Sequence, residues 1–221
     1  MMRVDNRRAV SMRGLFLSMI MMAAAPFAVA DPILDVKGEI DPAAIKKLIE
    51  EAAPAIRDYP PHFNGEAQKA SIVQSMRDAV GDLTQSRVLS INSPELATNV
   101  AFVLAMGHNL DLGTSDLANK TYQMSLKLDP DSRRANFYYG MFLASTAKGH
   151  ESSLLYLQKA FDLGEAGAEY TIGLLLVEQG RKEEGLNHLE HYSARFPDDQ
   201  RVKKIIESVK NDLIEFHKSG G

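Results

Sequence analysis

Three stretches of the sequence decide the fold: LAMGHNL at residues 104–110, FYYGMFL at residues 137–143 and YTIGLLL at residues 170–176. Each has a glycine at its centre, and Gly107, Gly140 and Gly173 follow one another at a step of 33 residues. Large apolar residues return at positions −3, −1 and +3 from each glycine. This spacing does not fit one face of a strand, but it fits a helix packed on two sides around a small residue. The chain therefore contains an internal repeat.

A second pattern follows each glycine and predicts a second helix. It consists of a small residue, a large apolar residue four positions later, and a small or aromatic residue three positions after that. Its members are Ala118, Tyr122 and Ser125, then Ser153, Leu157 and Ala160, then Gly185, Leu189 and Tyr192. Turn-forming glycines at positions 113, 149 and 180 separate the two patterns. Each unit is therefore expected to be a pair of antiparallel helices.

The repeat resembles the tetratricopeptide family, whose units of about 34 residues carry a small residue in each helix and a closing proline. Pro130 and Pro197 stand at that closing position, and LKLDPDS (residues 126–132) and LQKAFDLG (residues 157–164) look like the family's helix ends. Residues 159–180 are also similar to the Sel1-like branch of the same superfamily.

This chain departs from the family pattern four residues before each glycine, where the usual large aromatic residue is replaced by Val103, Asn136 and Glu169. The resemblance still implies an all-α, right-handed α-solenoid of stacked helical hairpins. Its three units are expected at about residues 99–132, 133–165 and 166–199, within a repeat region of residues 94–199.

The flanking segments predict caps for this stack. Residues 31–93 carry a helix from Asp41 and Pro42 to about residue 58, with a kink or break at Pro54, and a second helix at about residues 66–86. Their spacing does not follow the glycine pattern, so an N-terminal helical cap is favoured over a degenerate fourth repeat. Residues 87–92 are expected to be a loop, with Ser93 and Pro94 starting the next helix. Residues 200–221 are expected to form a C-terminal capping helix, capped by Asp198 and Asp199.

The first thirty residues have the organisation of a secretory signal peptide. Four arginines precede an apolar run at residues 15–25, and small residues at 28–30 form a cleavage site. The apolar run is too short to span a bilayer of about 30 Å as a helix, so cleavage after Ala30 is favoured over anchoring. The residues after Arg7 and Arg8 favour the general secretion route over the twin-arginine route. We therefore expect a periplasmic protein, with secretion as the second choice.

Composition and charge exclude several functions. The chain has no cysteine, so neither disulfides nor thiol chemistry are available. Removal of residues 1–30 would change the formal net charge from −4 to −7, and no long Lys or Arg stripe is present, so nucleic acid is not an expected partner. The chain contains no nucleophile elbow and no glycine-rich phosphate loop. Neither a catalytic residue nor a cofactor is predicted, and the chain is not expected to be an enzyme.

Glu184, His188 and His191 are the one weak metal candidate in the sequence. Their spacing places them on one side of a helix. The same positions flank the inward-facing Leu189 and Tyr192, on the side that such repeats usually leave to solvent, so no metal site is predicted.

The resemblance implies a concave groove lined by the first helix of each unit, at positions −3, +1, +4 and +5 from the glycine. The residues that it selects as the partner-binding set are Leu104, His108, Asp111, Leu112, Phe137, Met141, Ala144, Ser145, Tyr170, Leu174, Val177 and Glu178. Such a groove is mainly apolar and suits an amphipathic helix or an extended apolar peptide. Alternatively, the groove is filled by the chain's own helix at residues 41–58 or by its C-terminal helix.

These observations predict a non-catalytic adaptor or scaffold that binds a protein or peptide partner, in envelope assembly. The alternative is a module that binds an envelope glycan, another polymer or a small ligand. The apolar face of the last helix, which includes Val202, Val209 and Phe216, also admits a homodimer.

Overall fold

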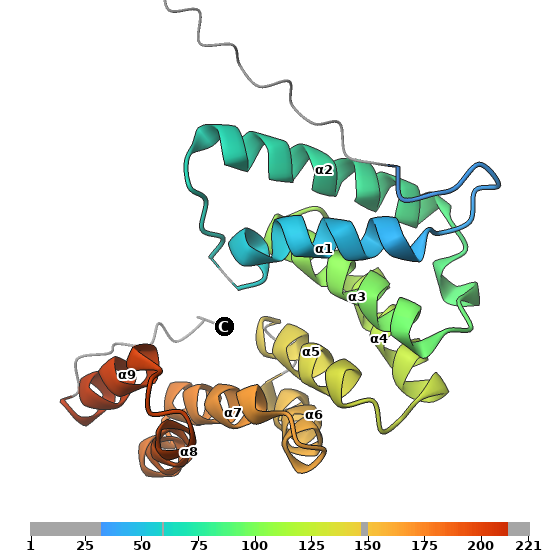
Figure 1. Ribbon diagram of the computed structural model, residues 1–221. Helices are drawn as coiled ribbons and strands as arrows, with labels where there is room; N and C mark the ends of the chain where they lie inside the picture. The colour runs from blue at the N-terminus through green and yellow to red at the C-terminus, as the bar shows by residue number, and fades with distance from the viewer. Residues whose placement is uncertain (1–31, 59, 147–149, 212–221) are drawn as a thin grey trace, which may run out of the picture.

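The computed structural model describes residues 32–58, 60–146 and 150–211 of the chain (Figure 1). Within these ranges the chain forms nine α-helices and one short 3-10 helix. Their bounds are α1 Pro42–Ile56, α2 Glu66–Gln85, η1 Val88–Ser90, α3 Pro94–Asn109, α4 Ser115–Leu128, α5 Arg133–Ala144, α6 His150–Asp162, α7 Ala166–Glu178, α8 Lys182–Arg195 and α9 Gln200–Lys210. The predicted signal peptide at residues 1–30 lies outside the described residues. No helix in the described part of the chain is long and apolar enough to cross a membrane.

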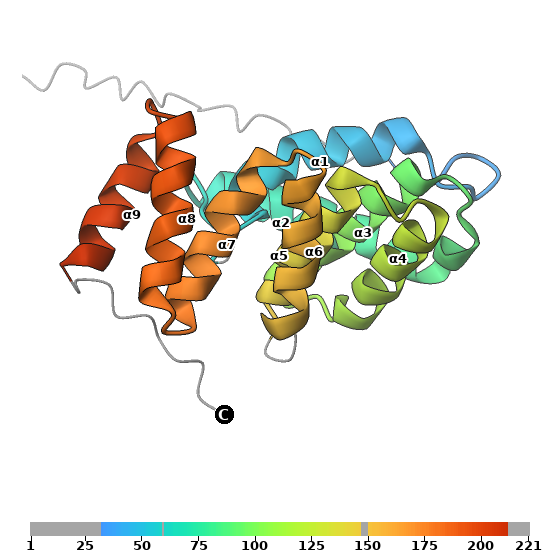
Figure 2. The same ribbon diagram turned by 90° about the horizontal axis from the view of Figure 1, so that it is seen from below.

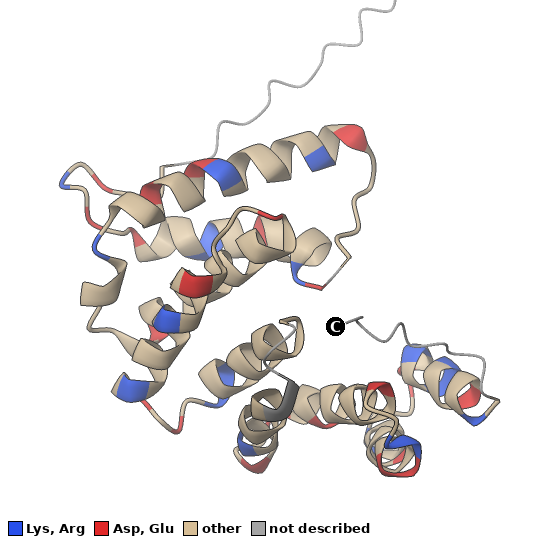
Figure 3. Ribbon diagram, turned by 180° about the vertical axis from the view of Figure 1, so that it is seen from behind, with Lys and Arg blue, Asp and Glu red and all other residues tan. Residues whose placement is uncertain are grey.

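Six of the helices pack as consecutive antiparallel pairs, α3 with α4, α5 with α6 and α7 with α8. The pairs follow one another along an arc, with α2 and α1 at one end and α9 at the other (Figures 1 and 2). The predicted all-α class is therefore confirmed, and the arrangement is consistent with stacked hairpins. Lys and Arg are interspersed with Asp and Glu along the helices (Figure 3).

Side-chain caps fix where several helices begin. The Asp41 carboxylate accepts a hydrogen bond from the Ala43 amide at 2.8 Å, and the Ser93 hydroxyl accepts one from the Leu96 amide at 3.3 Å. At the start of α9, Asp199 accepts a hydrogen bond from the Arg201 amide at 3.0 Å. These caps satisfy amide groups that have no partner inside the helix, and they confirm the predicted starts at Asp41, Ser93 and Asp199.

Gly140 and Gly173 face the second helix of their own hairpins, whereas Gly107 lies against Thr114, which precedes α4, and against Val80 of α2. A methyl group added at Gly140 would lie 2.7 Å from Leu157 Cγ, and one added at Gly173 would lie 2.8 Å from Leu189 Cγ. Leu157 and Leu189 are fully buried, as is Tyr122 at the corresponding position of the first hairpin. The glycines therefore permit the close approach of the two helices, and the second sequence pattern supplies the side chains that fill the contact.

The two N-terminal helices cover the face of α3 that lies away from α5. Ile45 and Ile56 of α1 and Met76 of α2 are fully buried in a core shared with α3. Pro54 lies inside the last turn of α1, and the helix ends at Ile56. The Asn109 amide donates hydrogen bonds to the carbonyl oxygens of Ile56 and Arg57 at 3.0 and 3.1 Å, which ties the end of α1 to the end of α3.

Residues 88–90 form a 3-10 turn within the segment that was expected to be a loop, because this turn buries Val88 in the same core. At the other end of the chain, Val202 and Val209 of α9 are buried in one cluster with Val177 and Leu189. This apolar face of α9 is thus packed inside its own chain. Phe216, which the sequence predicts to continue this face, lies outside the described residues.

Candidate functional site

A groove runs across the first helices of the three hairpins on the concave side of the arc. It encloses a cavity of about 530 Å³. Its walls come from α3, α5 and α7, Tyr122 of α4 contributes to the lining, and the two residues after α1 close one side. The lining residues are Arg57, Asp58, Phe102, Ala105, Met106, Asn109, Tyr122, Tyr138, Met141, Phe142, Ala144, Ser145, Thr171, Leu174, Leu175 and Glu178.

The groove uses the same positions in each hairpin. Position −2 from the repeat glycine is Ala105, Tyr138 and Thr171, and position +2 is Asn109, Phe142 and Leu175. A helix advances about 100° per residue, so positions −2, +2 and +5 point about 140–160° away from the glycine. Because the glycine faces the second helix of its hairpin, the groove lies on the opposite side of the first helix.

Some of the predicted groove residues line the cavity and others do not. Met141, Leu174 and Glu178 do, together with Ala144 and Ser145. The predicted position −3 lies only about 60° from the glycine, on the side that packs inside the hairpin. The predicted residues that do not line the cavity are Leu104, His108, Asp111, Leu112, Phe137, Tyr170 and Val177.

Most of these residues serve the packing of the stack instead. Leu104 is fully buried, and Val177 is buried in the cluster with α8 and α9. The ring of Tyr170 lies 5.4 Å from that of Tyr192 on α8. His108 lies edge-on to Phe142 at 5.8 Å, and Asp111 occupies the turn after α3 with a positive φ of 57°.

One wall of the groove is aromatic. The rings of Phe102 on α3 and Tyr138 on α5 are stacked with centroids 4.3 Å apart, so two successive hairpins share one flat apolar surface. The guanidinium of Arg134 lies 5.3 Å from the centre of the Tyr138 ring. The wall therefore connects α3 to α5 and presents aromatic side chains to the groove. The repeat pattern, which selects position −3, does not identify Phe102 or Tyr138.

Tyr122, which contributes to the lining of the groove, has a buried hydroxyl that the described part of the fold does not satisfy. Tyr122 is fully buried, and its hydroxyl has no hydrogen-bond partner among the described residues. Burial raises the pKa of this phenol well above 10.0, so the hydroxyl is protonated at neutral pH and can both donate and accept. An unsatisfied buried hydroxyl costs about 1–3 kcal/mol, and a ligand that reached it would recover part of that cost.

Charged groups stand on the two sides of the groove. Arg57 and Asp58 follow α1 and form an ion pair at 3.3 Å, while Glu178 lies at the end of α7. Burial raises the pKa of Tyr170, and the charge of Asp58 adds to that rise, because the end of α1 reaches toward α7. Thus α1 borders the groove, and neither α1 nor the described part of the C-terminal helix fills it.

A second group of titratable residues lies between α7 and α8. Glu169 is buried, with 2 % of its surface exposed, and its carboxylate binds His191 Nδ1 and, at 3.1 Å, Arg195. Glu184 and His188 lie in the same shallow cleft, but Glu184 forms an ion pair with Arg181. Among the described residues, no group of three His, Asp or Glu side chains is placed to hold a metal ion.

No protein-family model matches the sequence, and no curated protein matches it.

Proposed function

We propose that this chain is an exported, tetratricopeptide-like adaptor of the periplasm that binds a protein partner in the groove across α3, α5 and α7 and catalyses no reaction. The stacked helix pairs, the 33-residue step and the signal-like first thirty residues support this proposal. The observation that carries it is a mainly apolar groove across the three hairpins whose lining includes Tyr122, a residue with an unsatisfied buried hydroxyl. A partner that inserts an apolar side chain with a hydrogen-bonding end would satisfy the site.

The size of the cavity indicates how the partner binds. At about 530 Å³ it holds a few side chains rather than a whole domain. The aromatic wall formed by Phe102 and Tyr138 and the flexible side chains of Met141 and Leu174 are suited to an apolar anchor. Because tight binding requires a larger contact than this cavity alone, the partner would also cover the charged rim at Arg57, Asp58 and Glu178.

The first experiment is site-specific photo-crosslinking in cells that export the protein. A photoreactive amino acid at Met141 is expected to give one defined adduct, because this side chain is half-buried in the groove. The same amino acid at Leu155, which is 72 % exposed on α6 and outside the groove, is the matched control. Equal adducts from both positions, or an adduct from Leu155 alone, would refute binding in the groove.

The adduct then gives a quantitative test with a variant that does not weaken the fold. Tyr122→Phe removes the unsatisfied hydroxyl and should raise the melting temperature. It should also weaken binding of the captured partner about fivefold, because one hydrogen bond of about 1 kcal/mol is lost. Weaker binding by a variant that is more stable than the wild type cannot be due to unfolding. Unchanged affinity in Tyr122→Phe would show that the partner does not use this hydroxyl.

A further inference from the structure

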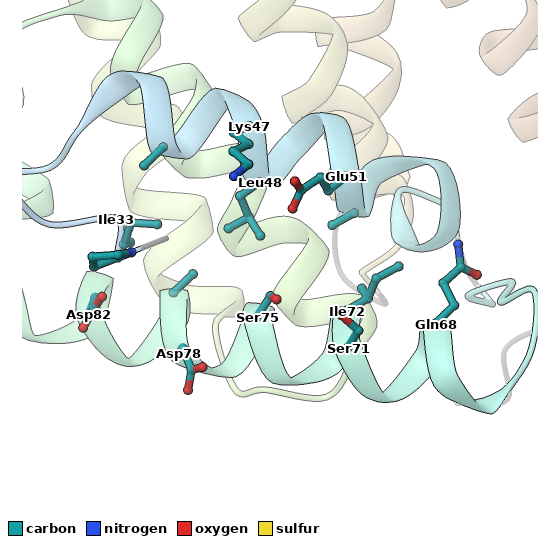
Figure 4. Close-up of a pocket in the computed structure, with 14 residues that line it drawn as sticks. Ile33, Lys47, Leu48, Glu51, Gln68, Ser71, Ile72, Ser75, Asp78 and Asp82 are labelled. Carbon is teal, nitrogen blue, oxygen red and sulfur yellow. The ribbon is translucent and has the colours of Figure 1, made fainter. Parts of the chain in front are cut away.

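A second cavity lies outside the groove, in a slot between α1 and α2. It has a volume of about 350 Å³ (Figure 4). In Figure 4, Lys47 and Leu48 extend from α1 toward Ile72 and Ser75 of α2, and Ile33 lies at the end of the slot near Asp82. The slot exists because short side chains face one another across it. These are Ala44 and Ala52 on α1 and Ser71, Ser75 and Ala79 on α2.

Several large apolar residues of these two helices pack against α3 instead of filling the slot. Ile45 and Ile56 of α1 and Met76 and Leu83 of α2 are almost completely buried in the core that both helices share with α3. The pair is therefore held together through α3, while the gap between the two helices stays open.

The floor of the slot is apolar and its rim is polar. Ile33, Leu48, Ala52, Ile72 and Ala79 are buried, with at most 8 % of their surface exposed. The rim carries the hydroxyls of Ser71 and Ser75 and four charged side chains, which are Lys47, Glu51, Asp78 and Asp82. A cavity of this size, with apolar walls and a few polar groups, has the properties of a small-molecule site.

The dimensions favour a single extended chain. Along α2 the lining extends from Gln68 to Asp82, which is roughly 21 Å at the helical rise. A volume of about 350 Å³ spread over that length describes a narrow slot rather than a rounded chamber. Such a slot suits an extended aliphatic chain that lies along its apolar floor.

The charges select the end group of that chain. Glu51 lies four residues after Lys47 on the same face of α1, where the two opposite charges offset each other. Asp78 and Asp82 lie on α2 toward the end that Ile33 closes, one helical turn apart. Among the described residues the Asp82 side chain has no ion-pair partner, and Asp78 accepts a hydrogen bond from the Gln74 amide at 2.9 Å. This end of the slot is therefore negative.

We propose that the slot between α1 and α2 binds a linear aliphatic molecule with a cationic end group, its chain on Leu48, Ile72 and Ala79 and its cation at Asp82. This site is separate from the groove and does not depend on a protein partner there. The carboxylate of Asp82 would supply a charge-assisted hydrogen bond to the ammonium, and the hydroxyls of Ser71 and Ser75 would face the chain.

The test is titration of the purified protein with primary n-alkylamines from butylamine to decylamine, followed by calorimetry and by amide chemical shifts. We expect saturable binding with shifts confined to α1, α2 and residues 32–34. Each added methylene should tighten binding about fourfold until the chain outgrows the slot, the fold-change that corresponds to about 0.8 kcal/mol per buried methylene. Absence of saturable binding, or affinity independent of chain length, would overturn the proposal.

Two variants and their controls separate the parts of the proposal. Ser75→Leu fills the slot and should weaken alkylamine binding more than about tenfold, whereas Ala70→Leu, on the exposed side of α2, should not change it. Asp82→Asn should weaken binding of octylamine about fivefold and leave octanol unaffected. Equal binding of octylamine and octyl sulfate would overturn the cationic end group.

Other occupants of the slot appear as distinct outcomes. Spermidine binding without alkylamine binding would show that the carboxylates, and not the apolar floor, hold the ligand, and it would overturn the proposal. A dimer that Ser75→Leu dissociates in sedimentation experiments, without any alkylamine binding, would assign the slot to a second copy of the chain and would overturn it as well.

Discussion

The contact between α7 and α8 allows the sharpest test of how this fold is built, by the substitution Gly185→Ala. A methyl group added at Gly185 would lie 2.6 Å from the carbonyl oxygen of Gly173 and 2.9 Å from the amide nitrogen of Val177. Both are backbone atoms of α7, so a change of side-chain rotamer cannot relieve the clash. The two helices must separate, which also loosens the contact of Gly173 with Leu189.

The magnitude follows from two opposing terms. Overpacking of a rigid core costs about 1–3 kcal/mol, and a clash with backbone lies at the upper end of that range. Alanine in place of glycine inside a helix contributes about 1 kcal/mol in the opposite direction. The net loss in the free energy of unfolding is therefore about 2 kcal/mol, which lowers the melting temperature of a domain of this size by about 4–8 °C.

Gly81→Ala is the matched control. Gly81 lies inside α2, and a methyl group added there meets no atom within 4 Å. The same substitution should therefore raise the free energy of unfolding by about 0.5–1 kcal/mol. Urea denaturation followed by circular dichroism measures both variants. A Gly185→Ala protein as stable as the wild type would refute the argument that backbone contact at this glycine sets the distance between α7 and α8.

Three further changes test other parts of the structure. Tyr122→Phe should raise the free energy of unfolding by about 1 kcal/mol in thermal melts, because it removes a buried hydroxyl without a partner, and an unchanged or lower value would contradict that reason. Burial raises the pKa of Tyr122 in the folded protein, so the stability of the wild type should fall as the pH rises above about 10, and this fall should be smaller in the variant. Asp199→Asn should keep the cap of α9 but flatten the acid limb of a pH series of melting temperatures. The ion pair with Arg201 lowers the pKa of Asp199 from 3.8 to about 2, so its contribution is present above about pH 4 and is lost between about pH 4 and 2. Superimposable curves for Asp199→Asn and wild type would rule out this ion pair as a source of acid sensitivity. Glu169→Ala should lower the free energy of unfolding by about 1–3 kcal/mol in urea, because His191 and Arg195 lose their buried acceptor, and Glu169→Gln should lose less.

The sequence by itself determined the hairpins. The glycine at each 33-residue step and the small and large apolar residues after it specify which faces of two neighbouring helices meet, and Gly140 with Leu157 and Gly173 with Leu189 meet as those patterns require. Caps at Asp41, Ser93 and Asp199 are equally local, since a capping side chain and its amide lie within three residues of each other. Such features depend on helical periodicity alone, so a linear pattern contains them.

Only the tertiary structure decided where the two cavities lie. The groove is opposite the repeat glycines, so its wall includes Phe102 and Tyr138, and position −3 turns into the hairpin. The positions of the first helices that line the groove follow from the direction in which the glycine points. Periodicity does not predict that the end of α1, at Arg57 and Asp58, borders the groove. That placement depends on hydrogen bonds from Asn109 to residues more than fifty positions away. The slot between α1 and α2 likewise exists because both helices direct their large residues toward α3, and a sequence pattern shows that a helix has an apolar face without showing which neighbour will cover it.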